Sequence, residues 1–492
     1  MGIAVRILLI DPPYNRLIGF KSEWFSLGLA YLASFVAEKG FNEICVYNAE
    51  HADDTKYKSI VKYAKDIGDY KKAINSNLHP VWEEIRKVIT SFRPDLVGLS
   101  VLTVKVPSAM RIANICKEIN PRIKVVCGGC HPTINPEEIL SSADVDFVVR
   151  GEGEQTFYEL LLSLKAHKVN YRDIDGLSFK EGRTVIHNKN RLFIQDLDDI
   201  PLPARERLLH VETYSPDQLS MVMSSRGCPY SCGYCDSKSI WRRKVRFRSI
   251  QNVIDEIVVL REKYGIRNIT FMDDSFTLDS KRVEKLCLAL IEQNINITWS
   301  CLTRVDMVSD KIISLMKKAG CTKVDVGIES GNERILRLID KKITLEQVRA
   351  AVQILRRHGM FWSGFFMFGF PTETENEVLD TLSFMKELKP DWANISIFSP
   401  YQGTKLYDLA KEKGMLSDPV DYTLYSHQNP HRFTDTMQKE QFSRLATYIL
   451  KEVHKYNRSP RSLINRMFSR KYHRNPRLFL SDIKKVIEWL RK

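Results

Sequence analysis

The chain has 492 residues, of which 43% are hydrophobic and 27% charged, and its net charge is +14. This length exceeds one ordinary hydrophobic core, so we expect a globular protein of two or three domains. No apolar run reaches the roughly 18 residues that cross a bilayer, which argues against a membrane-spanning helix. We expect a cytoplasmic protein, in which the 10 cysteines are thiols or metal ligands rather than disulfides.

The first part of the chain, residues 1–165, alternates short apolar segments with segments of helical periodicity. This alternation predicts a parallel, doubly wound sheet, which binds ligands beyond the carboxyl ends of its strands. The apolar start leads into Asp11-Pro12-Pro13 without a small-residue cleavage site, so we expect a buried strand and not a signal peptide. Strands are predicted at 5–10, 44–47, 96–101, 123–127 and 145–149, with helices over 27–38, 56–93 and 109–119.

A connector of residues 166–217 follows, with a predicted hairpin around 180–183 and a proline-marked turn at 200–203. A second series of strands and helices then occupies residues 218–405. Six such units predict an incomplete, TIM-like (β/α)6 barrel, whose chemistry lies at the C-terminal ends of its strands. The strands are predicted at 221–224, 268–272, 297–301, 323–326, 362–368 and 392–398.

Three cysteines follow the first barrel strand in a C-x3-C-x2-C pattern, at Cys228, Cys232 and Cys235. Iron–sulfur clusters usually take four cysteine thiolates, so three of them leave one iron open for another molecule. A zinc knuckle is the alternative, but zinc needs a fourth Cys or His close by, and the next downstream histidine is His358. The pattern therefore predicts a [4Fe–4S] cluster on these three cysteines.

From Met221 to about Thr404 the sequence resembles the radical S-adenosylmethionine (SAM) superfamily, through the cysteine motif and the ordered polar strand ends that follow it. The resemblance implies that the open iron binds SAM and that an electron from the cluster cleaves SAM to a 5′-deoxyadenosyl radical. The loop at 400–404 departs from the family pattern because it lacks a second proline, which leaves its role open. The SAM contacts that the resemblance implies are Tyr234, Asp273, Asp274, Arg304, Glu329, Ser330 and Gly369.

These residue types suit the implied roles. Tyr234 takes the family's position beside the adenine, and a carboxylate at 273 or 274 would make a charge-assisted bond to the SAM amino group. The planar guanidinium of Arg304 suits the SAM carboxylate. Gly369 would let the backbone approach a ligand closely.

Two elements of the first domain, Ser100-Val101-Leu102 and Gly128-Gly129, resemble the S-x-L and G-G elements of cobalamin-binding, flavodoxin-like (Rossmann-type) domains. The third element, D-x-H-x-x-G after the first strand, is absent, so no histidine of that loop can bind cobalt from below. His131 as a cobalt ligand, and a domain that no longer binds cobalamin, stay open as alternatives. The cobalamin contacts that the resemblance implies are Pro12, Ser100, Leu102, Thr103, Gly128, Gly129, Gly151 and Glu152.

Fusion of such a domain to a radical SAM barrel is typical of a class that includes C-methyltransferases and an anaerobic cyclase of chlorophyll synthesis. The leading hypothesis is thus a cobalamin-dependent radical SAM methyltransferase, which methylates an unactivated carbon by means of methylcobalamin and a 5′-deoxyadenosyl radical. The alternatives are a cyclase or oxidoreductase with both cofactors but no methyl transfer, and an RNA-modifying or non-catalytic binding protein. We expect a small, hydrophobic or lipid-like substrate, an electron donor such as flavodoxin or ferredoxin, and no nucleic-acid partner.

The last region, residues 406–492, is predicted to be helical and basic. Residues 451–492 hold 13 Lys and Arg against three Asp and Glu, a net of +10, and 483–490 shows apolar residues at helical spacing. A basic amphipathic helix can lie on an anionic membrane or cap the mouth of the barrel. We favour the cap, because radical chemistry needs a lid that excludes water, and keep peripheral membrane contact as the alternative.

Overall fold

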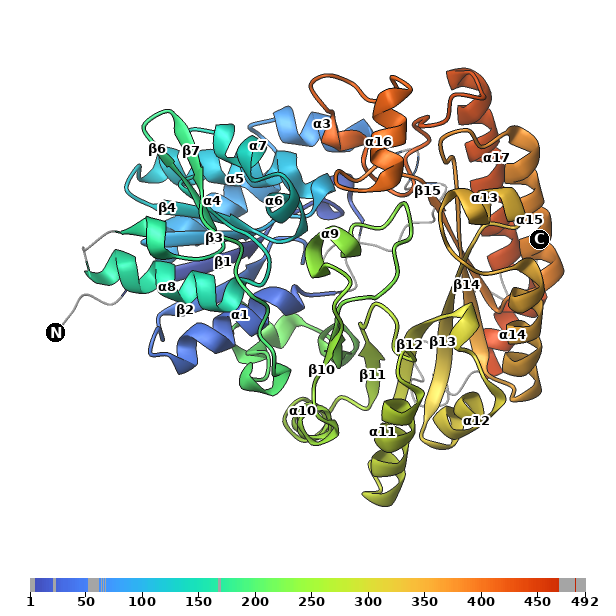
Figure 1. Ribbon diagram of the computed structural model, residues 1–492. Helices are drawn as coiled ribbons and strands as arrows, with labels where there is room; N and C mark the ends of the chain where they lie inside the picture. The colour runs from blue at the N-terminus through green and yellow to red at the C-terminus, as the bar shows by residue number, and fades with distance from the viewer. Residues whose placement is uncertain are drawn as a thin grey trace.

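The N-terminal part of the chain folds into a doubly wound sheet, as predicted (Figure 1). The computed structural model describes residues 5–20, 24–51, 68–166 and 170–468, with the single positions 62, 64, 66 and 483. The sheet order is β2-β1-β3-β4-β5-β6-β7, and the first five strands run parallel. Its strands are β1 (Ile7–Asp11), β2 (Ile44–Asn48), β3 (Leu96–Ser100), β4 (Lys124–Gly128), β5 (Phe147–Val149), β6 (Leu177–Glu181) and β7 (Thr184–His187).

Both faces of this sheet are covered by helices, which explains why its strands are near-continuous apolar runs. The side chains of Ile7–Ile10 are fully buried. The predicted hairpin in the connector exists as β6–β7 and extends the sheet in the antiparallel sense. The helices are α1 (Leu27–Glu38), α3 (Gly68–Asn75), α4 (Pro80–Phe92), α5 (Val106–Ile119), α6 (Cys130–Ile134), α7 (Pro136–Ser141) and α8 (Gly153–Ala166).

The helical insert predicted at 56–93 is not one helix. Helix α3 ends at Asn75, and α4 begins at Pro80, with His79 as its N-cap. Proline is well placed at the first position of a helix but cannot continue one, because it has no N–H and clashes with the preceding turn. Residues 56–61, 63, 65 and 67 of the predicted insert lie outside the described part of the chain.

The second half of the chain forms a six-stranded parallel sheet in the order β15-β14-β13-β12-β11-β8, curved into the predicted partial barrel. Large aromatic side chains, among them Trp299 and Trp362, are fully buried in it. The strands are β8 (Met221–Val222), β11 (Asn268–Phe271), β12 (Thr298–Arg304), β13 (Cys321–Glu329), β14 (Phe361–Phe368) and β15 (Trp392–Ile397). The helices are α10 (Ile250–Tyr264), α11 (Ser280–Glu292), α12 (Asp310–Lys318), α13 (Glu333–Leu338), α14 (Leu345–Arg357) and α15 (Glu375–Leu388).

Between the two sheets lies the segment that carries the cysteine motif (Figure 1). A short hairpin, β9 (Ser225–Arg226) and β10 (Arg246–Phe247), encloses the loop 227–236 and helix α9 (Ser237–Trp241). Helix α9 packs against α6 of the N-terminal half, so the loop after the first barrel strand directly adjoins the loop after β4. The fold therefore brings the two predicted cofactor regions together.

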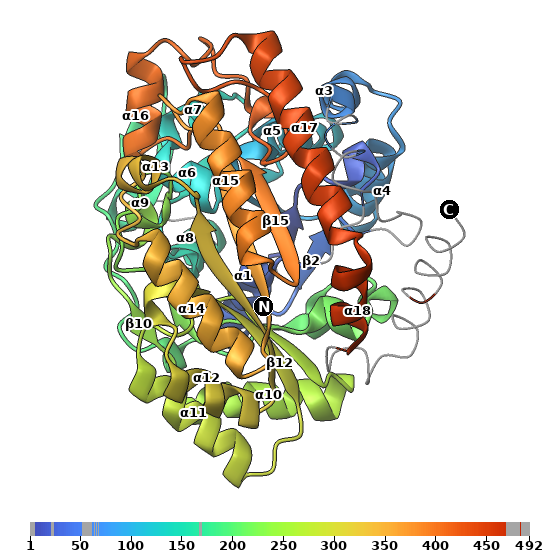
Figure 2. The ribbon, with the colours of Figure 1, turned by 90° about the vertical axis from the view of Figure 1, so that its right-hand side faces the viewer.

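The C-terminal region is helical at both ends of its described part: α16 (Lys405–Glu412), α17 (Lys439–Asn457) and α18 (Pro460–Phe468). Helix α17 runs beside β15 and α15, on the outside of the barrel (Figure 2). The intervening stretch 413–438 bridges the two halves, since Tyr422 Oη donates to Glu138 at 2.6 Å and Thr434 Oγ1 donates to the Glu373 carbonyl at 2.9 Å. Of the basic tail, residues 469–482 and 484–492 lie outside the described part.

A search of the described residues finds no helix that combines the length and the apolar character needed to cross a membrane.

Candidate functional site

The cysteine loop leaves the β9–β10 hairpin at Gly227, whose φ is +98°. A Cβ at this position would lie 2.1 Å from the Lys244 carbonyl oxygen, so only glycine fits. Farther along the loop, Gly233 donates its N–H to the Ile339 carbonyl at 2.7 Å and accepts a bond from the Leu406 N–H at 2.9 Å. Backbone bonds to the barrel thus fix the loop that carries the three cysteines.

Cys228, Cys232 and Cys235 are half-buried free thiols on this loop. Burial raises the pKa of Cys228, and it raises that of Cys235 to about 12, so thiolates there need a metal's positive charge. Among the described residues, no three Cys, His, Asp or Glu side chains lie close enough to hold a single metal ion. Three soft thiolates on one loop fit an iron–sulfur cluster, which is larger than one ion and spreads its ligands farther apart.

Arg304, at the end of β12, lies beside this loop. Its Nη1 donates to Cys232 Sγ at 3.8 Å, and its guanidinium stacks on Tyr230 at 3.6 Å from the ring centre. Asp306 takes two bonds from the same guanidinium, of 2.9 and 3.2 Å, and the Lys341 carbonyl takes a third. Arg304 therefore lies beside the cysteine loop, with Nη1 directed at Cys232. Its bond to the SAM carboxylate stays a prediction.

The structure separates the two adjacent aspartates after β11. Asp273 is buried and accepts three bonds, from Ser224 N at 3.2 Å, Ser224 Oγ at 2.8 Å and Ser225 Oγ. Asp274 is exposed and accepts one bond, from Ser237 Oγ at 2.9 Å, at the start of α9. Asp273 is therefore engaged in holding the first barrel strand, and Asp274 is the carboxylate available to a ligand.

Glu329 has a φ of +71° at the end of β13, and its buried carboxylate pairs with Lys341 Nζ at 2.7 Å. Lys341 also donates to Tyr234 Oη at 3.3 Å, so an ion pair connects this strand end to the cysteine loop. Ser330, the next residue, is fully buried, lies 3.1 Å from Thr381 through their hydroxyls and caps the Asn332 N–H. Glu329 thus lies near the predicted adenine position, whereas Ser330 stabilises the turn.

Gly369 directly follows β14 and has a φ of +88°. Its N–H donates to Glu373 Oε2 at 2.5 Å, and the Phe370 N–H donates to the same oxygen at 3.0 Å. Glu373 is fully buried, and its Oε1 has no hydrogen-bond partner in the described structure. Burial raises the pKa of this carboxyl to about 8, which makes Glu373 a neutral acid at pH 7.

The predicted cobalamin contacts lie along the carboxyl edge of the N-terminal sheet. Leu102 exposes 47% of its surface there, and a Cβ at Gly151 would meet nothing within 4 Å. A Cβ at Gly128 would meet only Val149, at 3.6 Å, an ordinary contact. An exposed apolar side chain, together with open space at Gly151, suits a large, flat, partly apolar cofactor.

Other residues of that edge, or their neighbours, make contacts within the protein. Gly129 has a φ of +103°, and a Cβ there would lie 3.1 Å from the Val101 backbone, so the fold itself requires glycine at this position. Pro12 and Ser100 follow β1 and end β3, and beside them Lys105 forms buried ion pairs with Asp11 at 2.6 Å and Glu50 at 3.2 Å.

His131 Nδ1 lies 3.3 Å from Thr103 Oγ1, and its ring packs edge-on against Tyr422 of the C-terminal region. Both oxygens of Glu152 are also engaged, with Arg226, Arg246 and the Ile194 N–H. Both oxygens of Glu152 thus bond between the two halves, so the side chain is not left free for the predicted contact to cobalamin.

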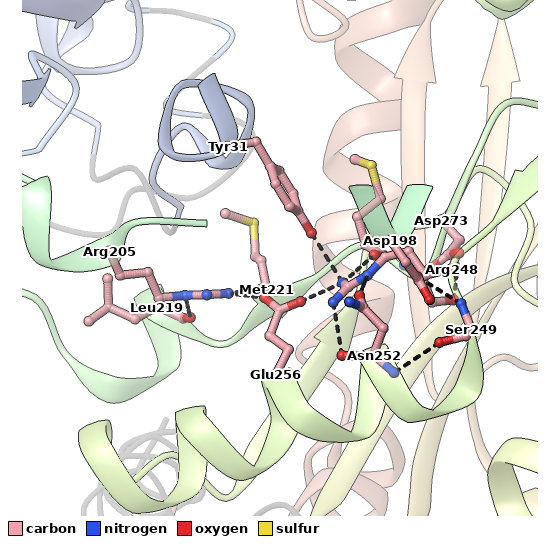
Figure 3. A network of polar contacts seen from close by, with 12 residues as sticks. Tyr31, Asp198, Arg205, Leu219, Met221, Arg248, Ser249, Asn252, Glu256 and Asp273 are labelled. Atoms are coloured by element: carbon pink, nitrogen blue, oxygen red, sulfur yellow. Dashed lines mark hydrogen bonds and ion pairs between the residues drawn. The ribbon is translucent and has the colours of Figure 1, made fainter. Parts of the chain in front are cut away.

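A second buried network joins the halves (Figure 3). Glu256 of α10 accepts Arg205 Nη2 at 2.9 Å and Arg248 Nη1 at 2.5 Å, and Arg248 Nη1 also lies 3.2 Å from Tyr31 Oη of α1. All of these side chains are buried. Buried charges require such pairing, because removing one partner leaves the other desolvated. The two halves thus share a buried, polar interface.

Several residues of the site were missed by sequence reasoning. Lys341 and Arg226 belong to no motif considered there, and Glu373 was given no role in the segment that follows the fifth barrel strand. The roles of these residues depend on chain segments that meet only in the folded protein. Asp306 could have been suspected, because a carboxylate two residues after a strand-end arginine is a natural partner for it.

Both halves match known families. Residues 16–161 match the B12 binding domain, and residues 222–385 match the radical SAM superfamily. The uncharacterized methyltransferase PH0819 of Pyrococcus horikoshii is 36% identical to the chain, over 90% of the chain and 91% of the relative. The anaerobic magnesium-protoporphyrin IX monomethyl ester cyclase of Rubrivivax gelatinosus is 26% identical, over 88% and 75%.

Among solved structures, the radical SAM methyltransferase TsrM from Kitasatospora setae, with cobalamin and a [4Fe–4S] cluster bound, matches 91% of both chains with a TM-score of 0.67 and 16% identity. This likeness shows a shared fold over nearly the whole chain.

The two matched domains imply the three predicted cofactors, a [4Fe–4S] cluster, SAM and cobalamin. The similarity to PH0819 extends over both domains. The chain therefore belongs to the radical SAM superfamily, within the group of enzymes whose barrel is joined to a B12 binding domain.

Proposed function

We propose that this chain is a methyltransferase that methylates an unactivated carbon of a small, hydrophobic substrate. The observation that carries the proposal is the packing of α6, directly after Gly128 and Gly129, against α9, directly after Cys235. With this contact, the predicted cobalamin edge of one half would lie next to the predicted cluster loop of the other. The related PH0819 is also called a methyltransferase.

The predicted site residues have distinct tasks in this proposal. When bound, the cofactors supply a carbon-centred radical for hydrogen abstraction and a methyl group for transfer. Asp274 would hold the SAM amino group, and Arg304 would face its carboxylate from beside Cys232. Tyr234, anchored through Lys341 to Glu329, would provide a fixed surface for the adenine. The stretch 413–438, which bridges both halves, would exclude water.

The division into a cobalamin-binding unit (1–165), a connector (166–217), a radical SAM barrel (218–405) and a C-terminal region (406–492) is part of this proposal. We also propose an electron donor of the flavodoxin or ferredoxin type, because reductive cleavage of SAM consumes an electron. We further propose that the enzyme is cytoplasmic and contacts the membrane at most through its basic tail. Such a contact would suit a lipid-like substrate.

Comparison of extracts from cells with and without the gene tests the methyltransferase proposal. The compound that accumulates only with the intact gene should exceed its precursor by one CH2, and cells with Cys228, Cys232 and Cys235 changed to Ala should resemble the deletion. A product related to its precursor by ring closure or oxidation, with no added CH2, would support the cyclase or oxidoreductase alternative instead.

A further inference from the structure

A buried group of four charged side chains connects the cysteine loop to the N-terminal half. Arg226 Nη1 pairs with Glu152 Oε1 at 2.8 Å, and Arg226 Nη2 pairs with Glu154 Oε1 at 2.7 Å. The second oxygen of Glu152 accepts Arg246 Nη1 at 2.8 Å and the Ile194 N–H at 2.9 Å. The two carboxylate side chains are 3% and 7% exposed and the two guanidinium groups about a tenth, so solvent does not screen these pairs.

The location of these pairs gives them a specific geometric effect. Arg226 lies two residues before Cys228, and only glycine fits at position 227 between them, because a Cβ there would lie 2.1 Å from the Lys244 carbonyl oxygen. Arg246 faces Arg226 across the β9–β10 hairpin. Glu152 therefore holds both strands that enclose the cysteine loop, and Glu154 adds a second bond to Arg226 of β9.

Those carboxylates come from the cobalamin side of the interface. Glu152 lies directly before α8 and Glu154 lies in its first turn, close in the chain to β5 and to the predicted cobalamin contact Gly151. Buried ion pairs add little net stability, since desolvation offsets their attraction, but two forked bonds from one guanidinium fix both distance and orientation. Global stability alone gives little reason for four buried charges at this position.

We propose that Glu152 and Glu154 are positioning residues that hold the cluster loop, through Arg226 and Arg246, at one fixed distance and orientation relative to the cobalamin edge. The proposal rests on the proposed function, in which one substrate carbon must meet both cofactors. Loss of this alignment would leave each cofactor site intact but mismatched. SAM cleavage would continue, and methyl transfer would fail.

The test uses the holoenzyme with Glu152→Gln and Glu154→Gln, which keep side-chain shape and remove the charge. Arg226→Lys is the third variant, because lysine keeps the charge but cannot bind both carboxylates with one planar fork. We expect normal iron and cobalamin contents and continued 5′-deoxyadenosine formation. The ratio of methylated product to 5′-deoxyadenosine should fall by about tenfold or more, as expected for small misplacements of reacting groups.

A second readout does not depend on turnover. Electron paramagnetic resonance of the enzyme with Co(II) cobalamin and reduced cluster reports the magnetic interaction between the two centres, and we expect this interaction to change in all three variants. Tyr31→Phe is the matched control: it removes the Tyr31–Arg248 contact of the same interface and keeps the ring that lies 5.6 Å from Arg226. This control should keep both the product ratio and the magnetic interaction.

An unchanged ratio together with an unchanged magnetic interaction in the three variants would overturn the positioning role. Parallel loss of cofactors and activity would overturn it as well, since the residues would then act only in folding. If the unaltered enzyme cleaves SAM without methylating any substrate, the proposed function fails. The magnetic measurement would still decide whether Glu152 and Glu154 set the distance between the centres.

Discussion

Replacement of Glu373 by Gln should remove a pH dependence of stability that this one carboxyl creates. In the folded protein its pKa is raised to about 8 from an ordinary value of 4.5, because the side chain is fully buried and Oε1 has no partner in the described structure. A carboxyl whose pKa is raised on folding stabilises the folded state at pH values below its pKa in the unfolded chain. This stabilisation is lost as the pH rises through its pKa in the folded protein. The relevant window therefore extends from about pH 4.5 to pH 8.

The magnitude follows from the two pKa values. Each pH unit within the window costs about 1.4 kcal/mol, so between pH 6 and pH 9 the carboxyl should lower the free energy of unfolding by about 3 kcal/mol. Gln has the shape of the neutral acid and can accept the Gly369 and Phe370 N–H bonds through its carbonyl oxygen, but it does not titrate. For a cooperative unit of about 250 residues, 3 kcal/mol corresponds to a shift in Tm of roughly 5 °C.

Calorimetry of the cofactor-free protein under reducing conditions, at several values between pH 6 and pH 9, provides the assay. Other groups titrate in both proteins, so the informative quantity is the difference in Tm between Glu373→Gln and the unaltered protein. This difference should shift in favour of the variant by about 5 °C over the range. Parallel profiles would show that Glu373 is ionised at pH 7 and that burial does not control its proton.

Three further predictions concern the cofactor sites. Changing Cys228, Cys232 and Cys235 together to Ala should abolish iron loading and 5′-deoxyadenosine formation, measured by iron analysis and chromatography. If this variant still formed 5′-deoxyadenosine, the cluster would not be bound by this loop. Asp274→Asn should weaken SAM binding by about tenfold to a hundredfold, the loss expected for a charge-assisted bond. Asp273→Asn should mainly lower Tm, because it disturbs three buried hydrogen bonds. Calorimetric titration measures the first effect and melting curves the second, and the opposite pattern would exchange the roles of the two aspartates. Gly128→Leu should block cobalamin loading and leave the iron content unchanged, since a Cβ is tolerated there in the fold; normal cobalamin absorbance in this variant would place the cofactor elsewhere.

The order of elements was predictable because it rests on local patterns. Apolar runs closed by Gly, Pro and polar residues marked the strands of both sheets, and the cysteine spacing marked the loop between them. The break between α3 and α4 was visible in principle, since Pro80 cannot continue a helix. The bonds that Glu152 makes between the two halves show the limit of motif reasoning.

Long-range partners decide the role of Glu152, and no local signal identifies them. Arg226 and Arg246 lie 74 and 94 residues away in the sequence, and only the packing of the two halves brings them to the same carboxylate. The two aspartates after β11 pose the same difficulty. Adjacent strand-end residues point to opposite sides, and the sequence does not fix which of them faces the core.

The most direct test of the account supplies the anaerobically reconstituted enzyme with SAM whose methyl group carries deuterium, together with extract from cells that lack the gene. The account predicts a product that gains the labelled methyl group, with 5′-deoxyadenosine formed in the same reaction, and neither outcome in the enzyme without its three cluster cysteines. Formation of 5′-deoxyadenosine with no label transferred to any product would contradict it.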